Sequence, residues 1–400
     1  MLTLDKIYHA AFILKNIART TDLLSSSSLK PNTHIYLKTE NLQVTGSFKV
    51  RGAYYKISQL TDEQKKAGVI ACSAGNHAQG VALSATKNGI KSVVCMPDGA
   101  PISKVEATKG YGAEVVLVPG VYDDAFNKAL ELQKEKGYTF VHPFDDEDVI
   151  AGQGTIGLEI LNQLENIDAV VVPIGGGGLI SGVAYTVKSL KPQIKVYGVQ
   201  AANAPSMFES LKKKEQITLD TVSTFADGIA VKHPGDLTFD LVSKYVDEVV
   251  TVSEDEIAMA ILTLMERQKL IAEGAGATAV AAVLSDKIPV DNKNVVCIVS
   301  GGNIDVNILS RVLTRGLKAS GRNVNLQIAL EDKPGQLVQV STIISKCGGN
   351  IINVRYERSD LNMPISSCYL TIGLETKNFE QIEVIKKELS KAGLKIVNVI

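Results

Sequence analysis

Apolar residues follow two different patterns along the chain, and the change falls near residue 318. Between residues 65 and 310, apolar runs rich in β-branched side chains alternate with amphipathic stretches; the runs cover residues 69–72, 92–96, 114–118, 169–173, 195–199 and 295–299. Such runs, separated by helical stretches, are typical of parallel sheets that helices cover on both faces. This region is expected to fold as an α/β domain.

Several helix boundaries can be recognised within this region. Residues 77–88 are expected to form a helix that ends at Gly89, and residues 254–269 a helix that begins with a capping box of Ser253 and Glu256. Ligands of open α/β sheets bind where the strands end. Chemistry is therefore expected at the junctions between strands and helices.

A smaller module is expected at the C-terminal end. The polar residues 318–323 indicate a linker, which separates residues 1–317 from residues 324–400. In the first strand of the module every second residue is large and apolar: Val324, Leu326, Ile328 and Leu330. A helix opened by Pro334 and Gly335 follows, with an apolar face of Leu337, Val340, Ile344 and Cys347.

The rest of the module continues the alternation of strands and helices. Strands are expected over residues 351–357, 366–374 and 394–399. The helix between the last two has an apolar side of Phe379, Ile382, Ile385 and Leu389 and ends at Gly393. The order βαββαβ predicts a ferredoxin-like module, small enough to need a partner for its sheet.

Composition and charge exclude several classes of binding partner. The 400 residues include 42 Lys and Arg against 43 Asp and Glu, a formal net charge of -1. Without concentrated basic residues, neither nucleic acid nor an anionic membrane surface is an expected partner, and the substrate should be a small molecule. The five cysteines are scattered and never spaced as CxxC, so neither a disulfide framework nor a metal site is predicted.

The apolar segments are too short or too interrupted for a signal peptide or a membrane helix. Near the N-terminus only residues 10–14 form an uninterrupted apolar stretch. A long uncharged run, residues 169–186, contains Pro173 and four consecutive glycines. We expect a cytoplasmic protein.

The strongest local signal is a strand that ends in four glycines before a helix. Glycines let backbone N–H groups converge, and the helix N-terminus adds partial positive charge, so the segment is suited to binding a phosphate. A tight turn is the simpler interpretation. The spacing does not match GxGxxG, which disfavours NAD. The segment expected to bind the phosphate consists of Gly175, Gly176, Gly177, Gly178 and Leu179.

Three further junctions carry polar groups. Lys49 follows Phe48 ahead of an apolar helix, and a lysine that forms a Schiff base together with a phosphate loop indicates pyridoxal phosphate. The loop of Ser73, Ala74, Gly75, Asn76 and His77 follows a strand and offers N–H groups to a carboxylate. His77 is interpreted as a helix-start residue that packs or caps, in preference to a general base. Ser300 stands at the tip of another strand, where a hydroxyl could meet a ring nitrogen.

Taken in order, the motifs SFKVRGA, SAGNHAQG, GGGGL and SGGN resemble those of threonine ammonia-lyases, pyridoxal-phosphate enzymes of the tryptophan synthase β-like fold (fold type II). The similarity runs from about residue 20 to residue 315 and includes KTEN, HPFD, ADG and EGAG; the family's Thr-Pro-Leu is Thr21-Asp22-Leu23 here. It implies a two-lobed parallel-sheet domain in which a small lobe of about residues 48–145 is inserted in the large lobe. The last 75 or so residues resemble an ACT regulatory domain.

The resemblance assigns roles to single residues. Lys49 would hold pyridoxal 5'-phosphate covalently, Phe48 would flank its ring, and Asn76 would contact the ring 3-oxygen. Gly175 to Leu179 would bind the phosphate, Ser300 would meet the pyridine nitrogen, and residues 73–77 would receive the substrate carboxylate. In the ACT-like module, an amino-acid or nucleotide effector is expected near Asp332, Gly335, Gly349 and Asn350, within a homodimer or homotetramer.

The implied reaction converts L-threonine to 2-oxobutanoate and ammonia, with L-serine giving pyruvate. Lys49 removes the α-proton, and a hydroxyl at Ser300, unlike a carboxylate, does not keep the ring nitrogen protonated; the weaker electron sink favours β-elimination. Serine racemases are similar but have a serine where Ala74 stands, and a methyl group cannot return a proton.

Several alternatives remain open at this stage. The racemases hold a divalent cation through a glutamate, a backbone carbonyl and an aspartate, and this chain has Gln200, Ala204 and Ser206 in those places. Because both carboxylates are missing, no divalent metal is expected, although K⁺ would still fit. A non-catalytic amino-acid sensor is a further alternative, against which Lys49 and Ser300 argue. The C-terminal module could serve only for dimerisation. The sequence does not distinguish isoleucine biosynthesis from threonine breakdown.

Overall fold

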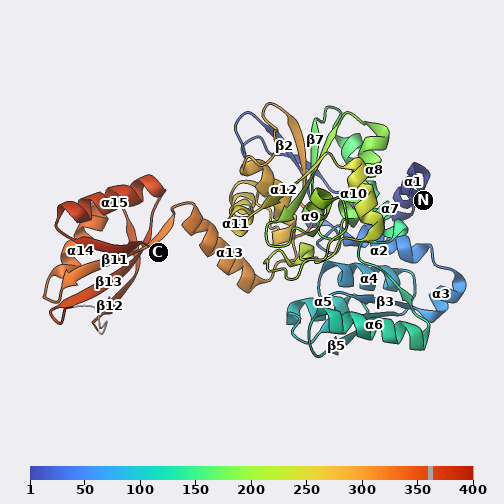
Figure 1. Ribbon diagram of the computed structural model, residues 1–400, viewed down its shortest axis with the longest axis horizontal. Coiled ribbons are helices and arrows are strands. Elements are labelled where there is room, and N and C mark those ends of the chain that lie inside the picture. Colours follow the sequence, from blue (N-terminus) through green and yellow to red (C-terminus); the bar gives the residue numbers. More distant parts are fainter. Residues whose placement is uncertain (359–363, 400) are drawn as a thin grey trace. The chain divides into compact units, whose positions relative to one another are not determined.

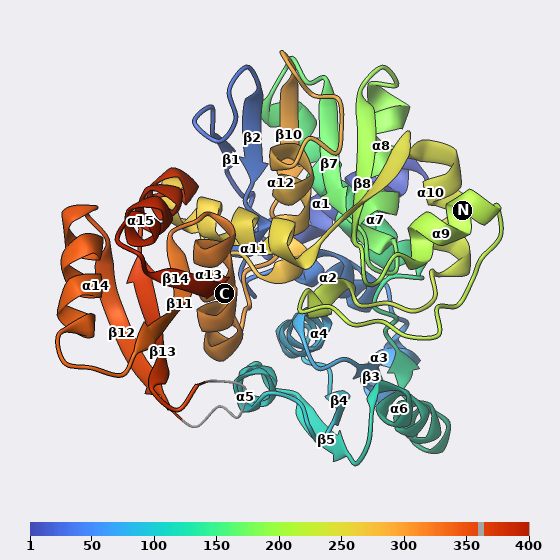
Figure 2. The same cartoon turned by 60° about the vertical axis from the view of Figure 1, so that its left-hand side comes forward.

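The computed structural model describes residues 1–358 and 364–399, and the chain divides into two compact units, Met1–Leu309 and Ser310–Ile400. Each unit is described by itself. The first contains two sheets of different size, and in both views helices α2 (Lys49–Ser58) and α4 (Asn76–Lys87) lie between them (Figure 1 and Figure 2). The first unit is thus two-lobed, as predicted.

The larger sheet of the first unit has six strands in the order β1-β2-β10-β7-β8-β9. All neighbours pair in parallel except β1 with β2, and the strands are β1 (Leu23–Ser25), β2 (His34–Lys38), β10 (Asn294–Ile298), β7 (Ala169–Pro173), β8 (Lys195–Ala201) and β9 (Glu248–Val252). Its main core packs Val170, Val172 and Val196 against helix residues such as Ile156 and Ile180. The central strands are buried on both faces, which explains their uninterrupted apolar sequences.

Helices cover the large sheet and join its strands. They are α1 (Leu4–Leu14), α7 (Glu147–Gln163), α8 (Gly178–Leu190), α9 (Ser206–Lys213), α10 (Asp236–Tyr245), α11 (Glu254–Thr263) and α12 (Gly274–Leu284), with the short 3₁₀ helices η1 (Glu40–Leu42) and η2 (Asp227–Ile229). The predicted capping box of Ser253 and Glu256 opens α11. The expected helix over residues 254–269 is not uniform, because a π-helix, η3 (Leu264–Gln268), replaces its last turn and ends at Lys269, whose φ is 58°.

The smaller sheet lies between β2 and β7 in the sequence. Its strands are all parallel in the order β5-β4-β3-β6, namely β5 (Glu114–Val118), β4 (Ser92–Pro97), β3 (Val69–Cys72) and β6 (Thr139–Phe140). Helices α3 (Asp62–Ala67), α4, α5 (Ile102–Gly110) and α6 (Tyr122–Lys136) connect them. The chain leaves the large sheet after β2, builds this lobe, and returns to the large sheet at β7.

The second unit has the predicted βαββαβ order. Its antiparallel sheet has the order β12-β13-β11-β14 and consists of β12 (Asn350–Glu357), β13 (Ser367–Glu375), β11 (Asn323–Glu331) and β14 (Lys395–Val399). Helices α14 (Gln336–Lys346) and α15 (Phe379–Lys391) pack on it through a core that includes Leu326, Ile344 and Ile385.

Two details of the second unit differ from the sequence interpretation. Helix α13 (Val306–Ala319) continues through Lys318, so only residues 320–322 connect it to β11, and the expected linker of residues 318–323 is shorter than predicted. The apolar periodicity carries the helix past the polar residues because Leu313 and Leu317 extend its apolar face. Phe379, expected on the buried side of its helix, is 58% exposed, because it is the first residue of α15 and stands beyond the edge of the core.

Candidate active site

Lys49 is the first residue of α2 and lies at the junction of the two lobes. Its side chain is half-buried, and its Nζ donates a hydrogen bond to the carbonyl oxygen of Pro143 at 2.7 Å. Desolvation lowers the pKa of the Lys49 amine to about 8, against the opposing charge of Glu273. A lysine with a lowered pKa supplies the neutral amine that covalent catalysis requires.

Helix α2 is fixed to the large lobe by a buried ion cluster around Arg51. The guanidinium, 1% exposed, donates to both carboxylate oxygens of Glu40 at 2.8 Å and to those of Glu159 at 2.6 and 2.9 Å. Its remaining contacts are the Thr155 hydroxyl and the Arg19 carbonyl oxygen. Although burial opposes its charge, the two carboxylates hold the pKa of Arg51 above its ordinary value. The start of α2, and with it Lys49, is therefore held firmly.

The four-glycine loop runs from the end of β7 into the N-terminus of α8. Gly177 has a φ of 98°, a left-handed conformation that other residues rarely adopt. A Cβ at Gly176 would overlap the Phe144 ring, and one at Gly178 would lie 2.9 Å from Phe144 atoms. Phe144 follows the Pro143 carbonyl that Lys49 contacts, so the loop and the lysine belong to one site.

The segment that follows β10 reaches the same site next to Lys49. Ser300, 3% exposed, accepts a hydrogen bond at its carbonyl oxygen from the Phe48 N–H at 3.1 Å. Gly301 forms an isolated antiparallel bridge with Ser47. The predicted residues Phe48, Lys49 and Ser300 are thus neighbours in space.

The loop of residues 73–77 forms the N-terminal end of α4. Gly75 donates its N–H to the Ser73 Oγ at 3.2 Å, and a Cβ added at Gly75 would have no atom within 4 Å. Asn76 opens the helix and contacts two residues of the large lobe: its Nδ2 donates to Glu273 at 2.6 Å, and its Oδ1 accepts from Asn303 at 2.8 Å. The loop therefore has an open side next to a fixed carboxamide.

His77 packs within the protein, as the sequence interpretation preferred. It is 3% exposed, and its Nε2 lies 2.8 Å from the Val141 carbonyl oxygen, an acceptor that requires the proton on Nε2. Burial, with a contribution from the positive charge of Lys49, lowers the pKa of His77 to about 3. The ring remains neutral at physiological pH, which argues against a role in proton transfer by titration.

Several residues of the site had no role assigned from sequence. Pro143 and Phe144 belong to HPFD, Glu273 to EGAG and Asn303 to SGGN, and the resemblance gives none of these four residues a role. Glu273 offered one local signal, a carboxylate directly before a helix of small residues. Its contact with Asn76 spans 197 positions in the chain and could not be read from local patterns.

The four residues expected to bind an effector do not meet within one copy of the second unit. Asp332 follows the end of β11 that pairs with Ser367, whereas Asn350 pairs with Glu375 at the other end of β13. The nine residues of β13 place these ends about 25 Å apart. Gly335 lies beside α14 at the Asp332 end, and Gly349 precedes Asn350 at the other.

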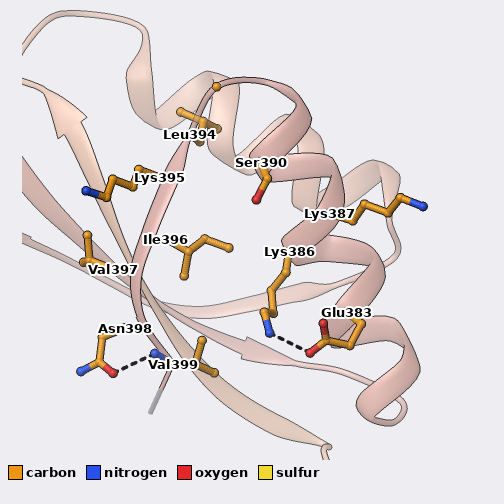
Figure 3. Close-up of a pocket in the computed structure, with 11 residues that line it drawn as sticks. Glu383, Lys386, Lys387, Ser390, Leu394, Lys395, Ile396, Val397, Asn398 and Val399 are labelled. Carbon is orange, nitrogen blue, oxygen red and sulfur yellow. Dashed lines mark hydrogen bonds and ion pairs between the residues drawn. The ribbon is translucent and has the colours of Figure 1, made fainter.

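A separate groove lies between α15 and β14 (Figure 3). It has a volume of about 810 Å³, and basic side chains of Lys386, Lys387 and Lys395 line it beside Glu383. Lys386 forms an ion pair with Glu383 at 2.7 Å, which Figure 3 shows along one side of the groove. None of the four expected effector residues lines this groove, and it contains no residue of the Lys49 site.

A half-buried lysine at the junction of two parallel-sheet lobes, beside a glycine loop at a helix N-terminus, defines the class of lysine-dependent α/β enzymes that bind a phosphorylated cofactor. A family model for pyridoxal-phosphate dependent enzymes matches residues 14–301, and the chain belongs to this family. The cofactor is pyridoxal phosphate.

Comparison with individual proteins shows which members of the family the chain is similar to. The chain is 50% identical over 398 residues to the L-threonine ammonia-lyase of Thermotoga maritima, which covers 99% of both chains. It is similar to the solved structure of threonine deaminase isoform 2 from Solanum lycopersicum, with a TM-score of 0.74, 38% identity and coverage of 78% of this chain and 94% of that one. The structure of maize serine racemase matches with a TM-score of 0.75, 35% identity and coverage of 79% and 98%.

The residues of the site fit this cofactor. Glycines 176 and 178 keep the loop backbone free of Cβ atoms, which suits a phosphate at the start of α8. Lys49 provides the amine, and Ser300 the hydroxyl that the resemblance places at the ring nitrogen. No helix in the described residues is long and apolar enough to cross a membrane.

Proposed function

We propose that the protein is a cytoplasmic L-threonine ammonia-lyase that forms 2-oxobutanoate and ammonia, and that it also converts L-serine to pyruvate. The observation that carries this proposal is Lys49, an amine whose pKa is lowered to about 8, between the glycine loop and the tip of β10. The similarity to a named L-threonine ammonia-lyase over almost the whole chain supports the choice of substrate.

The site residues that the resemblance identifies each have a task in this reaction. Bound pyridoxal phosphate withdraws electrons from the α-carbon of the amino acid. The N–H groups of residues 73–77 hold the substrate carboxylate, and Asn76 holds the cofactor at its 3-oxygen. Lys49 removes the α-proton, and the β-hydroxyl group takes up one proton and departs as water, so that one proton is removed and one is added. Hydrolysis then consumes one water as it releases ammonia. The overall change therefore requires no other reactant.

A 2-oxo acid assay with L-threonine, L-serine and D-serine tests the proposal. We expect turnover of L-threonine above that of L-serine and little turnover of D-serine. The absence of 2-oxobutanoate with cofactor-loaded enzyme would reject the activity. Repeating the assay with isoleucine, valine and AMP tests the effector and separates a biosynthetic from a catabolic role.

We also propose that the second unit is an ACT-like regulatory module in a homodimer or homotetramer. Its βαββαβ sheet exposes apolar residues on both edge strands, among them Val354 on β12 and Val399 on β14. Truncation after Arg322 is expected to leave turnover intact, remove any response to an effector and lower the oligomeric state. Identical saturation curves of the full-length enzyme with and without each amino acid, and no binding by calorimetry, would leave only a role in assembly.

A further inference from the structure

Glu273 is a buried carboxyl group beside Lys49 for which the proposed reaction has no task. It directly precedes α12 and is 3% exposed. Desolvation is the main reason that the pKa of Glu273 is raised to about 7, and the Asp227 carboxylate adds to the rise. Keeping a carboxyl group in such a place is unfavourable unless its contacts compensate.

Helix capping does not account for Glu273. The residue is the N-cap of α12, but its side chain makes no capping hydrogen bond there. Ser253 and Asp146, which hold the same position on α11 and α7, both accept hydrogen bonds from the helix backbone. The carboxylate of Glu273 instead reaches across to Asn76 on the small-lobe side of the site, at 2.6 Å.

The hydrogen bonds around Asn76 fix which way its carboxamide points. The Nδ2 of Asn303 donates to the Thr45 carbonyl oxygen at 2.7 Å, so this nitrogen is identified by its acceptor. Its second N–H donates to the Asn76 Oδ1 at 2.8 Å. The Asn76 Nδ2 must then face Glu273, which takes one of its two N–H groups. The other remains for a further acceptor.

Space around the carboxylate is limited, so the contact cannot easily be replaced. A Cβ added at Gly301 would overlap the Glu273 carboxylate and would lie 3.2 Å from the Asn76 Nδ2. A Cβ at Gly228 would lie 3.5 Å from the same carboxylate. Two glycines, Gly301 after β10 and Gly228 in η2, thus bring their backbone close to the pair without side chains of their own.

We propose that Glu273 is the positioning residue of the cofactor site: it holds the Asn76 carboxamide so that one N–H faces the 3-oxygen of pyridoxal phosphate, and it places a carboxylate beside Lys49. This inference rests on the roles of Lys49 and Asn76 in the proposed function. The charged groups around Glu273 are Lys49 on α2, Lys104 on α5 and Asp227 on η2. A negative charge here favours the protonated form of the Lys49 nitrogen, while Asn76 provides the directional contact.

Two substitutions separate the directional contact from the charge. Glu273→Gln keeps an oxygen that can accept from Asn76 and removes the charge, whereas Glu273→Leu removes both. Asp247→Asn is the control, because this carboxylate, just before β9, also accepts several hydrogen bonds: from Lys188 near the C-terminal end of α8, and from Lys195 and the Val196 N–H at the start of β8. Cofactor affinity is measured by absorbance titration of the apoenzyme, and the spectrum of the lysine-bound cofactor is followed against pH.

The expected results differ between the variants. Glu273→Leu should weaken cofactor binding by about tenfold or more, since a hydrogen bond to a charged group is lost. Glu273→Gln should bind the cofactor within about threefold of wild type, but its spectrum should titrate at a lower pH, because the carboxylate that favours the protonated nitrogen is gone. Asp247→Asn should match wild type in both measurements.

Two outcomes decide the inference. Wild-type affinity in Glu273→Leu together with a wild-type pH titration in Glu273→Gln would overturn it, even if turnover fell. Should Glu273→Leu fail to fold, Asn303→Ala takes its place; it frees the Asn76 carboxamide to rotate, and unchanged cofactor affinity there would equally count against the proposal. A Lys49→Ala enzyme that kept the lysine-bound spectrum would instead refute the proposed function, so the two failures can be told apart.

Discussion

Lys49 and Arg51 are two residues apart on the same helix, yet they have opposite surroundings. Arg51 donates to two carboxylates, a hydroxyl and a carbonyl group, and its pKa stays above the ordinary value. Lys49 donates to one neutral carbonyl oxygen, and its pKa falls to about 8. Full pairing fixes a charge in place, whereas incomplete pairing leaves an amine that can lose its proton and react. The same turn of helix thus contains its anchor and its reactive group.

The largest effect is expected from Lys49→Ala, which removes the reactive half of this comparison. Turnover should fall by at least about 1,000-fold, because the variant loses both the covalent link to the cofactor and the base for the α-proton. The 2-oxo acid assay and the absorbance of the lysine-bound cofactor measure the two losses. Wild-type activity in a cofactor-loaded variant would refute the assignment of Lys49.

Arg51→Met removes the anchor and should act mainly on stability. It leaves the buried Glu40 carboxylate without the cation of its ion pair, which typically costs about 3–5 kcal/mol, whereas Glu159 keeps its ion pair with Lys38 at 2.6 Å. Urea unfolding measures the change, with Lys109→Met as the control. Lys109 forms an exposed ion pair with Glu106 on α5, and its loss should cost less than about 1 kcal/mol. Equal effects of the two substitutions would contradict the comparison.

The pH dependence of reconstitution sharpens the contrast. Only the neutral amine of Lys49 reacts with the cofactor, so the rate at which apoenzyme gains the lysine-bound spectrum should rise with pH and level off above about 8. The unfolded chain keeps its proton up to about 10.5, so the apoenzyme should also gain stability as the pH rises between these values. A reconstitution rate that still rises tenfold per unit above pH 9 would show that the pKa of Lys49 is not lowered.

Ala74 tests whether Lys49 is the sole proton carrier at the α-carbon. Its methyl group, on the loop before α4, cannot return a proton from the face opposite Lys49. L-Serine should therefore give pyruvate with little D-serine, and Ala74→Ser should raise the D-serine yield. Chromatography on a chiral column measures both products. Formation of D-serine by the wild type at a rate close to that of pyruvate would reject the argument.

The smallest effect is expected from EDTA. The resemblance to racemases implies that Gln200 and Ser206 replace their two metal-binding carboxylates, and both side chains are fully buried. The Gln200 Oε1 already accepts the Phe208 N–H at 2.8 Å, which leaves little negative charge for a divalent cation. Turnover should change by less than about twofold after EDTA treatment and dialysis. A loss that Mg²⁺ restores would show that a divalent cation binds after all.

Patterns of local sequence predicted much of the fold. Apolar runs located the parallel strands because those strands are buried on both faces, and the capping box located the start of α11. Element ends were less certain: α13 passed through Lys318 because its apolar periodicity outweighs the polar composition there. The π-helix after Thr263 had no local signal, since it depends on packing rather than propensity.

The candidate site was predictable where one strand ends and one helix begins. Lys49, Asn76, the glycine loop and Ser300 all occupy such junctions, and the structure brings them together. The contact of Asn76 with Glu273 and that of Lys49 with Pro143 join segments 197 and 94 positions apart. Such pairs arise from how the lobes pack, which a single sequence does not encode in any local pattern.

The sheet of the second unit has one further consequence. Asp332 and Asn350 lie beside opposite ends of β13. The turn that contains Asp332 and the turn that contains Asn350 therefore cannot contact the same small molecule within one copy. A ligand that contacts both must bind where two copies meet. Binding of the ligand and association of the copies would then be thermodynamically linked, so that each would favour the other. Sensitivity to such a ligand would decline as the enzyme is diluted, and the cell could adjust it through the amount of protein it makes.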